Sequence, residues 1–156
     1  MAELTRREML VLTSAAVACA CCGDALGDDK AVARPATLVI GKLADFSTLG
    51  YYDTFRDKKI MVNRLADRLV VLSATCTHKG CTVKIDVNDP VQLRCPCHKG
   101  LFGEQGTPID GPPKSALVRF AVSIDDTGII TADTTKSFGE REWDKPEAFV
   151  AITPKP

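Results

Sequence analysis

The chain has 156 residues, of which 45% are hydrophobic and 26% are charged, as is usual for a globular protein that buries a core. Lysine plus arginine and aspartate plus glutamate both number 20, so the formal net charge is zero. This balance argues against a nucleic-acid-binding protein, which would carry a basic patch, and the length favours a single domain.

The first 27 residues have the pattern of an export signal. Arg6 and Arg7 form a charged start, and the run from Met9 to Gly23 that follows carries no charge. This run is too short for a comfortable transmembrane helix and suits the apolar region of a secretory signal, with a buried first helix as the alternative. The surrounding letters, TRREML, resemble the twin-arginine export motif.

We therefore expect a twin-arginine-type signal at 1–27, a polar linker at 28–35 and one domain at 36–156. Cleavage of the signal, lipid attachment at Cys19 and retention as an anchor all remain open. Export by this route predicts a periplasmic protein, or one on the outer face of the cytoplasmic membrane. Membrane association would then come from the N-terminus or from partners.

The body of the chain predicts short β-strands separated by turn residues. In chain order, the expected strands are 37–41, 51–55, 59–64, 68–74, 82–87, 91–94, 116–124, 128–133 and 148–153. Turns at 88–90 and 125–127 indicate two hairpins. No body segment shows a long helical periodicity, so we expect an all-β fold, an antiparallel sandwich or barrel. The segment 134–147 is ambiguous, and we expect its Trp143 to pack in a core.

Both histidines of the chain lie inside cysteine clusters, in the sequences CTHKGC and CPCHKG. Together these clusters contain Cys76-x-His78 and, after sixteen intervening residues, Cys95-x-x-His98. Two thiolates and two imidazoles on paired loops suit a tetrahedral zinc site. They equally suit a [2Fe–2S] cluster with two cysteines on one iron and two histidines on the other.

Two further cysteines, Cys81 and Cys97, lie just beyond this pattern, one in each cluster. In an exported protein they could form a disulfide that closes a loop of roughly 15 residues and adds about 3 kcal/mol of stability. Two free structural cysteines are the alternative. A zinc site does not require either residue.

The two clusters, with the later sequence Gly111-Pro112-Pro113, resemble the Rieske [2Fe–2S] family over roughly residues 36–132. The similarity is to its disulfide-containing branch, found in cytochrome bc-type complexes and related exported oxidoreductase subunits. The resemblance implies an antiparallel Rieske-type β-sandwich or barrel. It also implies a small cluster-binding part of two loops, at about 75–113, covered by a proline loop at 111–113.

The same resemblance implies one [2Fe–2S] cluster and assigns its ligands. The implied site residues are Cys76 and Cys95 on the inner iron, His78 and His98 on the outer iron, and Cys81 with Cys97 as a disulfide.

The sequence departs from the family beside the second cluster. High-potential members usually read C-P-C-H-G-S-x-Y, and the Ser and Tyr hydroxyls there stabilise the reduced cluster. This chain has Lys99 in place of the glycine, Gly100 in place of the serine and Phe102 in place of the tyrosine. We therefore expect a midpoint potential in the middle or lower middle of the Rieske range of roughly −150 to +300 mV.

The resemblance implies one-electron transfer on the outer side of the membrane, as the iron–sulfur subunit of a quinol–cytochrome c reductase-like complex. Its partners would be quinol, cytochrome b and a c-type cytochrome. Such a chain would be an electron-transfer subunit of an oxidoreductase complex and not a stand-alone enzyme. One alternative is the Rieske small subunit of an exported molybdenum oxidoreductase, bound to its large subunit. Another, of a different class, is a structural zinc-binding module.

Overall fold

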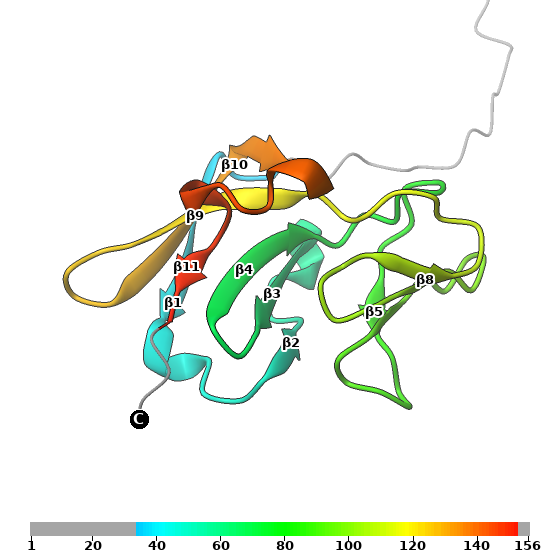
Figure 1. Cartoon of the computed structure of the whole chain (residues 1–156), viewed down its shortest axis with the longest axis horizontal. Helices are drawn as coiled ribbons and strands as arrows, with labels where there is room; N and C mark the ends of the chain where they lie inside the picture. Colours follow the sequence, from blue (N-terminus) through cyan, green and yellow to red (C-terminus); the bar gives the residue numbers. More distant parts are fainter. Residues whose placement is uncertain (1–33, 153–156) are drawn as a thin grey trace, which may run out of the picture. The chain divides into compact units, whose positions relative to one another are not determined.

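The computed structural model describes residues 34–152, so the expected signal at 1–27 and lipid-attachment residue Cys19 lie outside the described residues. The fold consists of two antiparallel sheets (Figure 1). The larger sheet contains β1 (Thr37–Lys42), β2 (Gly50–Tyr52), β3 (Ile60–Arg64), β4 (Arg68–Ser73), β9 (Arg119–Ile124), β10 (Ile129–Phe138) and β11 (Val150–Ala151). The smaller sheet contains β5 (Lys84–Ile85), β6 (Leu93–Arg94), β7 (Leu101–Phe102) and β8 (Pro108–Asp110). The all-β prediction is confirmed.

The strand order of the larger sheet is β1-β10-β9-β4-β3-β2, with β11 paired to β4, and that of the smaller sheet is β5-β6-β7-β8. Short 3-10 helices link the strands: η1 (Leu43–Asp45), η2 (Arg56–Lys58), η3 (Glu140–Glu142) and η4 (Pro146–Ala148). Within residues 34–152, no helix has the length and apolar character needed to cross a membrane.

The two strands β3 and β4 are buried on both faces, which explains their nearly continuous apolar sequences. Their alternate side chains enter two different hydrophobic clusters. One cluster contains Met61, Val70 and Leu72 together with Cys76, Cys95 and Phe102, and the other contains Ile60, Val62, Leu69 and Val71 together with Phe120 and Ile130. The predicted cysteine ligands therefore rest directly on the core of the larger sheet.

Both expected hairpins are confirmed, as β5 paired with β6 and as β9 paired with β10. The ambiguous segment 134–147 begins as a continuation of β10, which re-pairs with β9 after a bulge between Asp133 and Ser137. Trp143 is buried, as expected. The strands β7 and β8 were not expected from the sequence, because strands this short leave no alternating pattern to detect.

Two polar side chains of the larger sheet attach the smaller sheet to it. The Tyr51 hydroxyl lies 2.8 Å from the Gly103 carbonyl oxygen and 2.9 Å from that of Glu104, and hydrogen bonds them from within the core. The Asn63 amide, fully buried on β3, also donates to the Glu104 carbonyl. Burial raises the pKa of Tyr51, so its hydroxyl keeps the proton that it donates. These bonds fix the loop that leaves β7.

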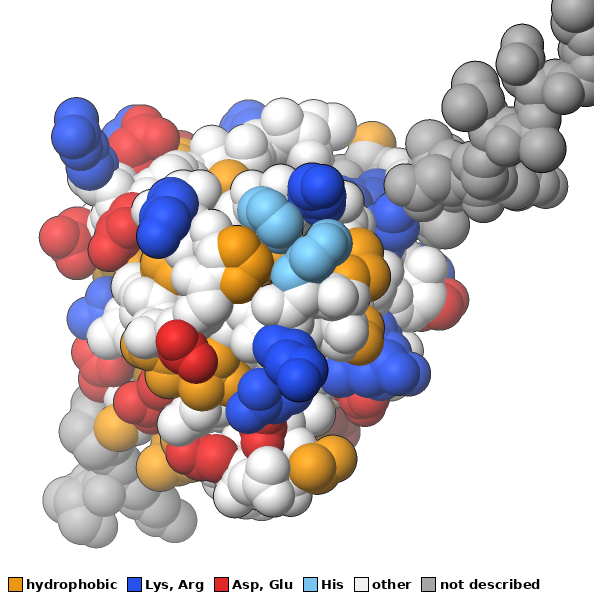
Figure 2. Space-filling view, turned by 90° about the vertical axis from the view of Figure 1, so that its right-hand side faces the viewer, with side chains coloured by type: hydrophobic (Ala, Val, Ile, Leu, Met, Phe, Trp, Pro, Cys, Tyr) orange, Lys and Arg blue, Asp and Glu red, His pale blue; other side chains and the backbone are white. Residues whose placement is uncertain are grey.

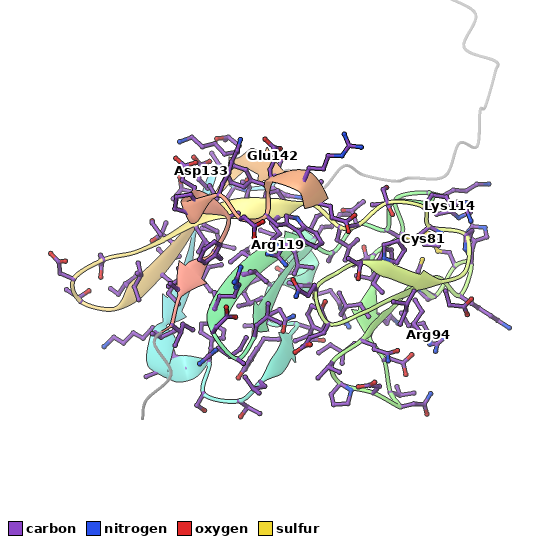
Figure 3. The ribbon with its side chains drawn as sticks, in the orientation of Figure 1. Cys81, Arg94, Lys114, Arg119, Asp133 and Glu142 are labelled. Carbon is purple, nitrogen blue, oxygen red and sulfur yellow. A yellow bond between two sulfur atoms is a disulfide. The ribbon has the colours of Figure 1, made fainter. Side chains whose placement is uncertain are left out.

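A buried arginine on β9 also binds the loop that follows β7. Arg119, labelled near the middle of Figure 3, is 1% exposed and donates from Nη2 to Oε1 of Gln105 at 3.0 Å. Its guanidinium lies over the Trp143 ring, 4.0 Å from the centroid. Burial lowers the pKa of Arg119 to about 10, so the side chain stays charged at neutral pH and the indole face stabilises it.

Candidate metal centre

The first candidate loop follows β4 and is closed by backbone hydrogen bonds. Thr75 and Thr82 form a bridge at its base. Above this bridge, the Cys76 N–H donates to the Cys81 carbonyl at 2.8 Å, and the Gly80 N–H donates to the Cys76 carbonyl at 2.9 Å. The loop is therefore a tight turn, and His78 lies between the residues that close it.

The second candidate loop connects β6 to β7. The Cys95 N–H donates to the Gly100 carbonyl at 2.7 Å, which closes a turn around His98. Lys99 adopts a φ of 57°, in the left-handed region that favours glycine. Lys99 therefore holds this turn in a backbone conformation that a glycine would adopt without steric cost.

The two free cysteines lie in the interior of the site. Cys76 is 3% exposed and Cys95 is 2% exposed, and their thiols are in hydrogen-bonding contact. Burial raises the pKa of the Cys76 thiol, while hydrogen bonds from the backbone N–H groups of His78 and Lys79 oppose that rise. A coordinated metal ion would supply the missing positive charge and deprotonate such thiols.

The two histidines lie side by side at the surface (Figure 2). Their ring centroids are 4.7 Å apart, and the rings meet edge to face at 87°. His98 is exposed, whereas His78 is half-buried and its Nδ1 atom is buried with no hydrogen-bond partner among residues 34–152. Removal from water lowers the pKa of His78, with smaller contributions from His98 and Lys79. A neutral imidazole with an unpartnered nitrogen is the form that ligates metals.

A disulfide joins the two loops. Cys81 and Cys97, sixteen residues apart in the chain, are bonded, and their Cα atoms are 6.5 Å apart. The disulfide prediction is confirmed. The sulfur atoms of Cys81, Cys95 and Cys97 all lie within 4.8 Å of one another, so the bridge lies directly beside one of the predicted ligands.

A third loop, between β8 and β9, packs on the second one. A Cβ atom placed on Gly100 would lie 2.6 Å from Cγ and 2.7 Å from Cδ of Pro113. A Cβ atom on Gly111 would lie 2.9 Å from the Gly100 Cα atom. The Thr77 hydroxyl donates to the Ser115 carbonyl at 2.7 Å, which ties this loop to the first one as well. The buried ring of Pro113 therefore occupies the space that a side chain at position 100 would need.

These features define a small all-β metalloprotein in which three loops surround two buried thiols and two surface imidazoles. The donor set, with its unpartnered His78 nitrogen, suits a [2Fe–2S] cluster bound by two cysteines and two histidines. The chain belongs to the Rieske [2Fe–2S] domain family, whose pattern matches residues 37–122, more than half of the chain. Its cofactor is accordingly a Rieske [2Fe–2S] cluster.

Two curated relatives illustrate where such domains occur. The menaquinol:cytochrome c reductase iron–sulfur subunit of Bacillus subtilis is 33% identical over 93 residues, covering 58% of this chain and 55% of that protein. The carotenoid phi-ring synthase of Chlorobaculum tepidum is 34% identical over 100 residues, covering 64% of this chain and 14% of that protein. The chain thus spans about half or less of the length of these relatives.

Among solved structures, the cyanobacterial plasma membrane Rieske protein PetC3 from Synechocystis PCC 6803 matches with a TM-score of 0.47. It is 27% identical, and the match covers 61% of this chain and 97% of that chain.

The structure places His78 beside His98, Cys76 beside Cys95, and the Cys95 sulfur within 4.8 Å of the sulfurs of the Cys81–Cys97 bridge, while the assignment of Cys76, His78, Cys95 and His98 as ligands stays a prediction. The sequence analysis did not identify the residues that attach these loops to the larger sheet, above all Tyr51, Asn63 and Arg119. The sequence gives little indication of these residues, because a single polar residue in an otherwise apolar strand only interrupts the run of apolar residues. Nor did it identify the contact between Gly100 and Pro113, which joins residues thirteen positions apart.

Substitution of Phe102 tests the expected effect of a missing hydroxyl. Phe102 is fully buried in the same cluster as Cys76 and Cys95. We expect Phe102→Tyr to raise the midpoint potential by about 40 mV, since a hydroxyl bonded to a cysteine sulfur would favour the reduced state by about 1 kcal/mol. Redox titration followed by electron paramagnetic resonance (EPR) measures the shift. The control Phe102→Leu should lower stability without raising the potential; an equal rise in both variants would contradict the assignment.

Proposed function

We propose that this protein transfers single electrons on the outer side of the membrane, using one cluster held by Cys76, Cys95, His78 and His98. When bound, the cluster takes up and releases one electron at a time. The observation that carries the proposal is the difference in burial within the donor set: both cysteines are buried, whereas His98 is exposed and His78 is half-buried. An electron-transfer partner can therefore approach the histidine edge while the protein keeps water from the sulfur side.

The histidines also offer a site for proton exchange. Because Nδ1 of His78 is buried, Nε2 is the ring nitrogen left to interact with a donor. His98 is the more exposed of the pair and can hydrogen bond a ligand at the surface. A quinol that gives up an electron must also give up a proton, and an imidazole ligated through Nδ1 would receive that proton at Nε2 when Nε2 is deprotonated.

The proposed complex is a quinol–cytochrome c reductase or a related assembly. The relative from Bacillus subtilis, named as a menaquinol:cytochrome c reductase subunit, supports this assignment. Cytochrome b with quinol would then be the donor and a c-type cytochrome the acceptor. A twin-arginine-type signal at 1–27 would deliver the folded protein to the periplasmic side, which N-terminal sequencing of protein from fractionated cells would test.

Spectroscopy and metal analysis test the proposal directly. We expect a coloured protein with two irons and two acid-labile sulfides per chain, and a Rieske-type EPR spectrum after reduction by dithionite. The physical reason is that two neutral imidazoles make the irons inequivalent. A colourless protein that contains one zinc per chain and gives no EPR signal would contradict electron transfer and indicate a structural zinc module.

A further inference from the structure

Each of the three loops around the site carries one lysine and no carboxylate. The first loop contributes Lys79, the second Lys99 and the third Lys114. Segments 75–82, 95–102 and 111–118 contain no aspartate or glutamate. We call Lys79, Lys99 and Lys114 the tip lysines. The chain as a whole is neutral, so these three loops carry a local excess of positive charge.

The tip lysines are exposed, and none makes an ion pair with any residue from 34 to 152. Elsewhere on the described surface, several basic side chains pair with neighbouring carboxylates, as in Arg68–Asp67 and Lys145–Glu142. The loop sequences are consistent with this difference, since the segments that carry the lysines contain no acidic residue. The nearest carboxylate in sequence is Asp110, at the end of β8.

These charges surround the histidine edge. Figure 2 shows a basic side chain directly beside the two histidines and further basic side chains on the same face. Lys114 lies at the same end of the molecule as Cys81 (Figure 3). Hydrophobic side chains also border the two histidines in Figure 2, and acidic side chains lie farther from them on the same face.

We propose that the tip lysines dock the histidine edge onto an acidic surface of a protein redox partner. This inference rests on the proposed electron-transfer function and names the chemistry of the partner. Complementary charge steers association and orients the partners, so that the histidine edge meets the partner first. The attraction acts over a distance set by ionic strength, about 30 Å at 0.01 M and about 8 Å at 0.15 M salt.

The test uses the cluster-containing protein with two c-type cytochromes, one of strongly acidic and one of strongly basic surface. Binding is measured by calorimetry with the oxidised protein and zinc-substituted cytochromes, in which no electron can flow. Electron transfer is measured separately by stopped flow with the native cytochromes. Both measurements are repeated from low to physiological ionic strength.

Charge-neutralised variants make the test specific. The tip variant carries Lys79→Gln, Lys99→Gln and Lys114→Gln, and the matched control carries Lys42→Gln, Lys136→Gln and Arg141→Gln on the larger sheet and η3. We expect the tip variant to bind the acidic cytochrome about tenfold more weakly at low salt, with a flatter salt dependence, whereas the control variant should match the wild type. The midpoint potential and EPR spectrum verify that each variant retains its site.

Three results would overturn the docking proposal: equal binding by the tip variant and the wild type, equal loss in the control variant, or preference for the basic cytochrome. A membrane role is a separate outcome. If the tip variant lost only its sedimentation with vesicles of phosphatidylglycerol and phosphatidylcholine, and kept its binding to the cytochrome, the lysines would serve an anionic lipid surface instead.

The separate measurements of binding and of electron transfer distinguish failure of the docking proposal from failure of the proposed function on which it rests. Salt-dependent binding of the zinc-substituted acidic cytochrome without any electron transfer to the native one would support docking and contradict the proposed function. Rapid electron transfer that is indifferent to salt and to the tip lysines would overturn docking and leave the proposed function standing.

Discussion

Replacement of Cys95 by serine should abolish the cluster, with loss of the EPR signal of the reduced protein and of stoichiometric iron. Cys95 is buried beside Cys76, and the nearest other sulfurs, those of Cys81 and Cys97, are tied up in the disulfide and cannot replace it while the bridge is intact. A serine hydroxyl is a far weaker ligand for iron–sulfur clusters than a thiolate, because it does not ionise near neutral pH. The same result is expected for Cys76→Ser.

The disulfide cysteines should behave differently, although they lie in the same two loops. Removal of the bridge between Cys81 and Cys97 should lower the free energy of unfolding by about 3 kcal/mol and leave cluster assembly possible. Single substitutions leave one free thiol within 4.8 Å of the Cys95 sulfur, where it could replace a ligand. The informative variant is therefore the double substitution Cys81→Ser with Cys97→Ser.

Iron content, EPR spectra and chemical unfolding of the reconstituted proteins distinguish the two pairs of cysteines. The ligand variants should lose iron, and the double disulfide variant should keep it but unfold at lower denaturant concentration. The wild type treated with a reductant strong enough to open the bridge provides a matched control for the double variant. Equal iron loss in both sets of variants would show that the assigned division between ligands and disulfide is wrong.

The chemistry of the site could be predicted from the sequence because it is encoded locally. Cys76 and His78, like Cys95 and His98, are separated by one or two residues, so a tight turn suffices to bring each pair together. The two hairpins were also predictable, since each is marked by turn residues between apolar runs. The bridge between Cys81 and Cys97 was expected from the family resemblance, while the residues alone left free thiols as an alternative.

What holds the site in place could not be predicted, because it depends on contacts between distant residues. Tyr51 and Asn63 lie more than forty residues before the Glu104 carbonyl that both bind. Nothing in the sequence around either residue indicates that partner. Similarly, β7 and β8 exist because they pair with β6 and with each other, not because of their own sequences.

The contact between Gly100 and Pro113 changes the meaning of the missing serine hydroxyl. From the sequence alone, Gly100 is a position that lacks a side-chain hydroxyl to donate a hydrogen bond. In the structure its backbone has no positive φ that would require glycine, and the steric requirement comes from the Pro113 ring. A serine cannot enter unless the proline loop moves, and a proline ring has little freedom to move. The missing serine hydroxyl at position 100 and the close packing of the proline loop therefore have the same cause, which is the contact between Gly100 and Pro113.

We therefore expect Gly100→Ser alone to lower the free energy of unfolding by about 1–3 kcal/mol, as overpacking does, without raising the midpoint potential. The double variant Gly100→Ser with Pro113→Ala removes the two colliding carbon atoms. It should recover most of that stability relative to Pro113→Ala and raise the potential by about 40 mV.

Chemical unfolding and EPR-monitored redox titration of the wild type, both single variants and the double variant form a complete cycle for this test. Gly139→Ser is the matched control, since a Cβ atom there meets nothing within 4 Å and φ is −75°. It should change neither quantity. A simple additive outcome, with Gly100→Ser equally harmful whether residue 113 is proline or alanine, would contradict the steric coupling. A raised potential in Gly100→Ser alone would show that the proline loop yields to the hydroxyl, and that the glycine is not required by Pro113.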